Sequence, residues 1–171
     1  MLKVIYLAGG LAGAVTLSQF PEFSQQYLQR LAGQVDALSV VVADFDESAA
    51  EAGLTRDEAM AEYRGTPFLD GRHDDMEATF TRYERLSGNL ALLRAATPLE
   101  RLTMPHRFAD RDLLEDTFAD YAPAVPTTTA GAVSAGIGYA LGWLILAGLV
   151  TLILWPIRRA RGASSSRRMR A

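Results

Sequence analysis

Residues 130–155 read AGAVSAGIGYALGWLILAGLVTLILW, a run of 26 residues without a charge. A helix needs about 20 apolar residues to cross the hydrocarbon core of a bilayer. Eleven residues of the run are Leu, Ile or Val, and together they favour insertion by roughly 3–7 kcal/mol. The alternative is a helix buried in the core of a soluble protein. The length of the run and its lack of charge favour a transmembrane helix, which we expect over residues 129–156.

The charges of the chain are segregated along the sequence. All 20 Asp and Glu, but only ten of the 16 Arg, lie between residues 22 and 120, so this stretch carries a formal charge of about −10. Six Arg and no acid follow residue 155. Cytoplasmic segments beside a transmembrane helix are enriched in Arg and Lys. We therefore expect residues 157–171 to form a basic cytoplasmic tail.

The first three Arg of this tail, Arg158, Arg159 and Arg161, lie next to the apolar run. We expect them to set the topology and to contact the headgroups of membrane lipids, because Arg near an anionic leaflet is attracted to it. A docking site for a cytoplasmic protein would have the same composition, so both interpretations stay open.

A second apolar run, LKVIYLAGGLAGAVTLSQF, spans residues 2–20. Its uninterrupted apolar core, Val4 to Leu17, is 14 residues long, a length that also suits the hydrophobic region of a cleaved signal peptide. We interpret residues 1–20 as an uncleaved first transmembrane helix, with Lys3 at its cytoplasmic end and Pro21 breaking the helix as it leaves the bilayer. Either interpretation places residues 21–128, an acidic domain, on the far side of the membrane.

Small residues recur at four-residue intervals in both apolar runs. They are Gly9 and Gly13 in the first run and Ser134, Gly138 and Gly142 in the second. Small residues at this spacing let the backbones of two helices approach closely in lipid. Gly is also frequent in membrane helices in general, which is the alternative explanation. We expect a helix-packing face, used either between the two spans or with the span of a partner.

Apolar residues form a stripe after the first run, at alternating gaps of three and four. The stripe consists of Leu28, Leu31, Val35, Leu38, Val42 and Phe45, and it continues to Ala49. This heptad pattern, typical of a coiled coil, predicts a helix over about 22–50. A second periodic segment predicts an antiparallel partner helix over about 74–95, and short helices are expected after Thr55, after Thr97 and over 112–121. We expect the stripe to serve as an interaction face, covered by the domain itself or by a second copy.

No segment of the chain alternates convincingly in the manner of a strand. The predicted fold class is an all-α membrane protein, with two transmembrane helices flanking a periplasmic helical-hairpin domain.

The strongest polar cluster of the sequence is Asp70-Gly-Arg-His73-Asp74-Asp75. Its His and Asp side chains have the chemistry of metal ligands or of acid–base groups, but adjacent residues rarely converge on one ion. Asp74 and Asp75 are more simply explained as the N-cap and first turn of the following helix, where acids are favoured. Gly65, Pro67 and Gly71 are expected to mark a loop before this helix.

Several classes of protein are disfavoured by the composition. The chain has no Cys, which excludes disulfides and thiolate chemistry. Phosphate-binding glycine loops and nucleophile elbows do not occur, and an acidic domain does not suit nucleic acid. We therefore predict no catalytic residue, no metal ligand and no cofactor, and the sequence favours a protein that is not an enzyme.

A short glycine-rich span followed by SQFPEFSQQYLQRLAGQVDAL at residues 18–38, a helical middle and a C-terminal span with a basic tail resembles a proteobacterial inner-membrane family. This family is catalogued as domain of unknown function 2937. The resemblance implies a bacterial origin, an inner-membrane location and two spans with both termini in the cytoplasm. It brings no activity, cofactor or catalytic residue.

The leading functional hypothesis is a structural, accessory or assembly protein. It would contact a membrane or periplasmic protein, or a second copy of itself, through its helices. The first alternative is a periplasmic hydrolase or metal-dependent enzyme around His73, with Asp70, Asp74 and Asp75 as ligands or acid–base groups. The second alternative is a lipid-handling protein with an apolar groove between its helices.

Overall fold

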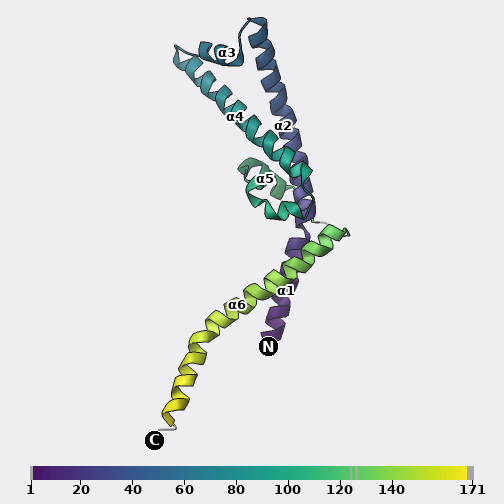
Figure 1. Ribbon diagram of the computed structural model, residues 1–171, viewed down its shortest axis with the longest axis vertical. Coiled ribbons are helices and arrows are strands. Elements are labelled where there is room, and N and C mark those ends of the chain that lie inside the picture. Colours follow the sequence, from purple (N-terminus) through teal and green to yellow (C-terminus); the bar gives the residue numbers. More distant parts are fainter. Residues whose placement is uncertain (1, 124, 126, 169–171) are drawn as a thin grey trace. The chain divides into compact units, whose positions relative to one another are not determined.

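The computed structural model describes residues 2–123, 125 and 127–168, with side chains as far as residue 155. This part of the chain is all-helical and contains no strand, which confirms the predicted fold class. Its elements are α1 (Leu2–Ser18), α2 (Phe20–Glu51), α3 (Arg56–Glu62), α4 (Pro67–Ala95), the 3₁₀ turns η1 (Glu100–Thr103) and η2 (Pro105–Phe108), α5 (Arg111–Ala119) and α6 (Thr129–Arg168) (Figure 1). The chain divides into two compact units: one contains α1 and α6, and the other residues 23–121.

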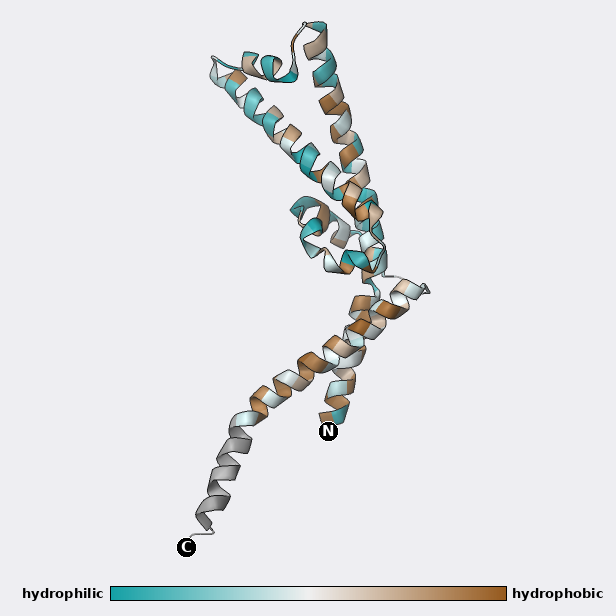
Figure 2. Ribbon diagram, viewed as in Figure 1, coloured by the Kyte–Doolittle hydropathy of each residue, from teal (hydrophilic) through white to brown (hydrophobic). Residues whose placement is uncertain are grey.

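The first unit holds the two apolar helices. By length and composition, both the helical segment that begins at Leu2 and the segment Thr129–Trp155 are long and apolar enough to cross a membrane. Apolar residues follow one another along most of α6 in Figure 2. Many of their large side chains, such as those of Val15 and Leu152, are exposed. An apolar exterior of this kind suits contact with lipid better than contact with water.

A one-residue turn separates α1 from α2, two residues before the break expected at Pro21. The structure has a turn at Gln19, whose backbone N–H donates to the carbonyl of Thr16 at 3.3 Å. Pro21 then occupies the first turn of α2. A proline is tolerated there because the N–H groups of the first turn have no partner within the helix.

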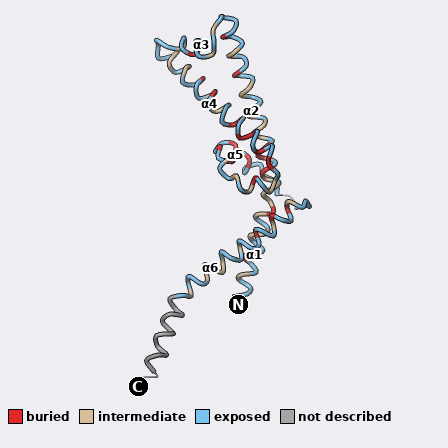
Figure 3. The backbone as a smooth tube through the Cα atoms, in the orientation of Figure 1, coloured by how far each residue is buried: buried red, intermediate tan, exposed pale blue. Residues whose placement is uncertain are grey.

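The second unit is a helical hairpin in which α2 and α4 meet near one end and diverge toward the other, where α3 bridges them (Figure 1). A cluster of Val42, Met60, Met76 and Phe80 connects these three helices. Burial concentrates on the facing sides of α2 and α4 (Figure 3). The hairpin core is therefore narrow and runs along the helices.

Most of the heptad stripe lies in this core. Leu28, Leu31, Val35, Val42 and Ala49 are buried, while Leu38 and Phe45 are half-buried. The domain itself therefore covers most of the stripe, which leaves little of it for a second chain.

The short segment between α2 and α3 ends the first helix and starts the second. Gly53 has a positive φ of 73°, which an L side chain adopts only with strain, and it donates to the carbonyl of Ala50 at 2.9 Å. Leu54 donates to the carbonyl of Ala49 at the same distance. Thr55 and Glu58 then form a capping box at the start of α3, the short helix expected after Thr55. The hydrogen bonds from Thr55 lower the pKa of Glu58.

The predicted start of α4 is wrong. The helix begins at Pro67, with the Thr66 side chain accepting a hydrogen bond from the backbone of Leu69, so the expected loop around Gly71 is helical. Asp74 and Asp75 lie within the helix and do not cap it. The Thr66–Pro67 pair supplies both an N-cap and a favoured first residue, and an interior Gly costs a helix only about 1 kcal/mol. The stronger start therefore prevails.

The segment after α4 is more compact than predicted. Thr97 and Glu100 form reciprocal hydrogen bonds, but only the 3₁₀ turn η1 follows where a short helix was expected, and Pro105 begins the second 3₁₀ turn, η2. Arg101 is buried and its Nε donates to the carbonyl of Leu93 at 2.9 Å. This contact satisfies one of the free carbonyls at the end of α4. Burial lowers the pKa of Arg101.

Asp110 links three helices at the base of the hairpin. Its carboxylate caps α5 by accepting from the backbone of Leu113, and it pairs with Arg82 at 3.2 Å and Arg85 at 2.9 Å, both on α4. Tyr27 of α2 is buried nearby. Burial, and secondarily the charge of Asp110, raise the pKa of this tyrosine. The carboxylate is only 5% exposed, so it depends on these partners to offset its loss of water.

We expect Asp110→Asn to lower the free energy of unfolding by about 2–3 kcal/mol, because Asn keeps the helix cap but loses two charged hydrogen bonds. Asp112→Asn is the matched control, since Asp112 also pairs with Arg82 but is 72% exposed. The control should cost less than about 1 kcal/mol. Denaturant unfolding of the full chain in detergent, followed by circular dichroism, measures both. Equal effects of the two substitutions would show that Asp110 is not a buried hub.

Candidate functional site

The predicted helix-packing residues come together where α1 and α6 meet. A Cβ added to Gly13 would lie 2.1 Å from the carbonyl oxygen of Gly138, and one added to Gly138 would lie 2.1 Å from that of Gly13. Real Cβ atoms do not approach a backbone oxygen so closely. The two helices are therefore in backbone contact, which only glycine permits at both positions.

The same contact repeats one turn away along each helix. A Cβ on Gly142 would lie 2.1 Å from the carbonyl oxygen of Gly9, and one on Gly9 would meet Leu146. Because Gly9 pairs with Gly142 and Gly13 with Gly138, the helices run antiparallel. Ser134, one turn before Gly138, is completely buried, and its hydroxyl has no hydrogen-bond partner within the described part of the chain.

The contact also uses residues that the sequence reasoning missed. A Cβ on Gly10 would lie 2.5 Å from the ring of Tyr139. The rings of Tyr6 and Trp143 meet edge to face, with centroids 5.7 Å apart. The adjacent glycines Gly9 and Gly10 are the feature of the sequence that could have indicated this contact, because two adjacent small residues leave room for an aromatic ring against the helix. Interlocking of this kind supplies the dispersion contacts that hold helices together in lipid.

The basic residues expected to set topology are only partly described. The backbone of α6 continues as a helix to Arg168. The side chains of Arg158, Arg159 and Arg161 lie outside the described residues, and their proposed role stays a prediction.

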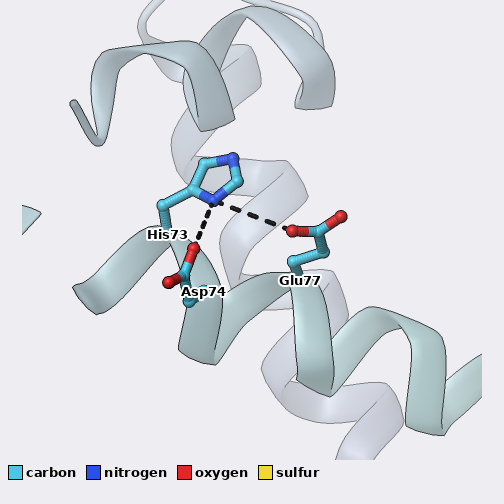
Figure 4. Close-up of side chains that lie close together, drawn as sticks. All are labelled: His73, Asp74 and Glu77. Carbon is cyan, nitrogen blue, oxygen red and sulfur yellow. Dashed lines mark hydrogen bonds and ion pairs between the residues drawn. The ribbon is translucent and has the colours of Figure 1, made fainter. Parts of the chain in front are cut away.

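The histidine cluster of the sequence lies on α4. His73 Nδ1 is 3.2 Å from Asp74 Oδ1 and 3.9 Å from Glu77 Oε2, so two carboxylates approach one ring nitrogen (Figure 4). One ligand atom from each of the three residues lies within 4.8 Å of the others. Glu77, one turn after His73, was not among the ligands expected from the sequence.

The other expected ligands point to different contacts or positions. Asp75 pairs with Arg72 at 3.3 Å, and Asp70 lies in the first turn of α4. The change follows from the earlier start of the helix, because residues at i and i+4 share a helix face whereas residues at i and i+2 do not. A contiguous acidic run is therefore split between faces.

A cation already lies against the histidine ring. Arg64 Nη2 is 2.9 Å from both ring nitrogens of His73. With the ring proton on Nδ1, that nitrogen can donate to Asp74 and Nε2 can accept from Arg64, which leaves the approach of Arg64 to Nδ1 without a hydrogen bond. A metal ion at Nδ1 would require the other tautomer, which turns a donor toward the guanidinium.

A cavity of about 460 Å³ adjoins this cluster. It is lined by Arg56, Asp57, Met60, Ala61, Arg64, His73, Glu77 and Phe80. This lining offers no hydroxyl or thiol that His73 could activate as a nucleophile. The cluster therefore has the geometry of a satisfied polar network, with incomplete features of a metal site.

The fold and these contacts define a class: an all-helical protein with two candidate membrane-spanning helices packed through glycines. The family model for the protein of unknown function DUF2937 matches residues 1–159, so the chain belongs to that family. No curated protein and no solved structure matches the chain.

We expect Gly138→Leu combined with Gly142→Leu to separate α1 from α6, because each new side chain would overlap a backbone carbonyl. Overpacking of this kind costs about 1–3 kcal/mol per site. Gly136→Leu with Gly148→Leu is the matched control, since a Cβ at either position meets nothing within 4 Å. Dodecyl sulfate titration in mixed micelles measures the loss of stability. Equal stability of the two double variants would show that the glycine contact is not needed.

Proposed function

We propose that this chain is a bacterial inner-membrane accessory or assembly protein that acts through helix-mediated protein contacts and has no catalytic activity. The observation that carries the proposal is the pair of glycine-packed, mostly apolar helices, which would anchor a separate polar unit in the membrane. An anchor of this kind would keep the surface of the helical hairpin next to the membrane, which suits recognition or assembly.

The proposed topology follows from charge. The unit of residues 23–121 is strongly acidic, whereas every charge after Trp155 is positive. The positive residues would hold the C-terminus in the cytoplasm, and an even number of spans returns the N-terminus to the same side. The acidic unit would then lie in the periplasm.

The surface that would contact a partner differs from the heptad stripe. Because that stripe is mostly buried, the candidate contact residues are large apolar side chains that the second unit exposes. These are Val40, Val41, Phe68, Leu92 and Phe118. Exposed apolar side chains in an otherwise polar unit favour protein contact.

A second candidate function is a metal-dependent enzyme at His73, favoured by the approach of Asp74 and Glu77 to the ring. The Arg64 guanidinium argues against it, because a cation at the ring repels a metal ion.

Photo-crosslinking in native membranes tests the proposal. A photoreactive residue at Val40 or Leu92 should give a discrete adduct with another protein, or a product at twice the monomer mass if the contact is with a second copy. The same residue at Glu84, an exposed polar position on α4, is the control and should give neither. If only monomer appears while His73→Ala reproduces the phenotype of a deletion, the proposal is wrong and the histidine cluster is the site.

A further inference from the structure

A groove of about 390 Å³ lies in the second unit, between the C-terminal half of α2, α3 and α4. Its apolar floor includes Phe45, Ala49, Tyr63 and Met76. The Phe45 ring meets the Phe80 ring edge to face, with centroids 5.2 Å apart. The floor of the groove is therefore continuous with the hairpin core, and the Phe45 side chain is held in place by its contact with Phe80.

The groove follows one face of α2. Its lining runs from Val41 to Ala52, a distance of about 16 Å at the rise of an α-helix. This length accommodates roughly three turns of another helix laid along α2. Helices that bind in grooves do so through apolar anchors on successive turns of one face.

Two carboxylates flank this apolar floor. Asp44 of α2 and Glu62 of α3 are both exposed, and neither forms an ion pair with any described residue. The lining contains no Arg, Lys or His. By contrast, Asp46 on the same stretch of α2 is neutralised by Arg56, whose hydrogen bonds lower the pKa of that carboxyl. The groove therefore combines apolar surface with uncompensated negative charge.

We propose that this groove binds a basic amphipathic helix of a partner protein, with apolar residues on the floor and Arg or Lys beside Asp44 and Glu62. The inference rests on the proposed function and specifies the chemistry of the partner. Matched charge at the rim of an apolar contact gives such binding its specificity.

Other occupants fit this groove less well. A second copy would bring another acidic unit, and its arginines are largely engaged, as in the pairs Arg56–Asp46 and Arg111–Glu115. The basic tail of the same chain, most of which belongs to the end of α6, lies across the membrane in the proposed topology. Anionic lipid headgroups would be repelled by the two carboxylates.

Fluorescence anisotropy of the full-length protein in phosphatidylcholine nanodiscs tests the inference. The probe is a labelled 18-residue Leu/Lys amphipathic helix, with empty nanodiscs as the background. Asp44→Asn with Glu62→Gln removes the rim charges, and Ser48→Trp fills the groove but keeps them. Asp36→Asn with Glu84→Gln is the matched control, because it changes the net charge equally at exposed positions outside the lining. Circular dichroism verifies that each variant is folded.

We expect saturable binding that weakens at least about tenfold in the rim variant and in Ser48→Trp, and less than about twofold in the control. Equal weakening by both charge variants, no effect of Ser48→Trp, or no binding above empty nanodiscs would overturn the inference. The proposed function is separable from it: a crosslinked partner at Val40 that persists in Ser48→Trp would retain the function and reject the groove.

Discussion

The contact between glycine backbones of α1 and α6 is the interaction that most tightly restricts which residues the structure can accept. At Gly13–Gly138 and at Gly9–Gly142, a single added carbon atom would overlap a carbonyl oxygen of the opposite helix. Because apolar burial gives helices in lipid no drive to associate, dispersion contacts at this short distance must hold them. The antiparallel pair brings the end of α1 near the beginning of α6. The second unit has the same property, since Phe23 and Tyr121 at its two ends are in ring contact with centroids 5.6 Å apart. Each unit thus has its two chain connections side by side.

The second unit is held together differently, by a narrow apolar core and by polar contacts at its base. Buried Arg101 satisfies the end of α4, and buried Asp110 joins α4 to α5 through Arg82 and Arg85. Many of the ten Arg in this unit serve such internal contacts, which leaves an excess of acid on the surface. That division matters for function, because unpaired carboxylates such as Asp44 and Glu62 are the ones available to a basic partner. A lipid-handling role is less well supported, since the apolar groove between α2, α3 and α4 is flanked by the carboxylates of Asp44 and Glu62, which repel anionic headgroups.

Much of this fold follows from local patterns in the sequence. Local patterns are those that depend on residues only a few positions apart, such as the uncharged runs, the heptad stripe, the Thr55–Glu58 capping box and the four-residue spacing of glycines. The described elements agree with the predicted all-α class. The start of α4 was missed because two competing helix starts, Thr66 and Asp74, lie within one segment. Because of that error, the prediction did not place Glu77 beside His73. The Asp110 and Arg101 contacts and the groove join residues far apart in sequence, so no periodicity could reveal them.

The central claim is that two packed apolar helices span a membrane and carry the acidic unit to its far side. Alkaline phosphatase fusions test it most directly, because this enzyme forms its disulfides and becomes active only after export. The account predicts an active fusion after Ala122 and an inactive fusion after Arg161. The reverse pattern, or equal activity of both fusions, would contradict it.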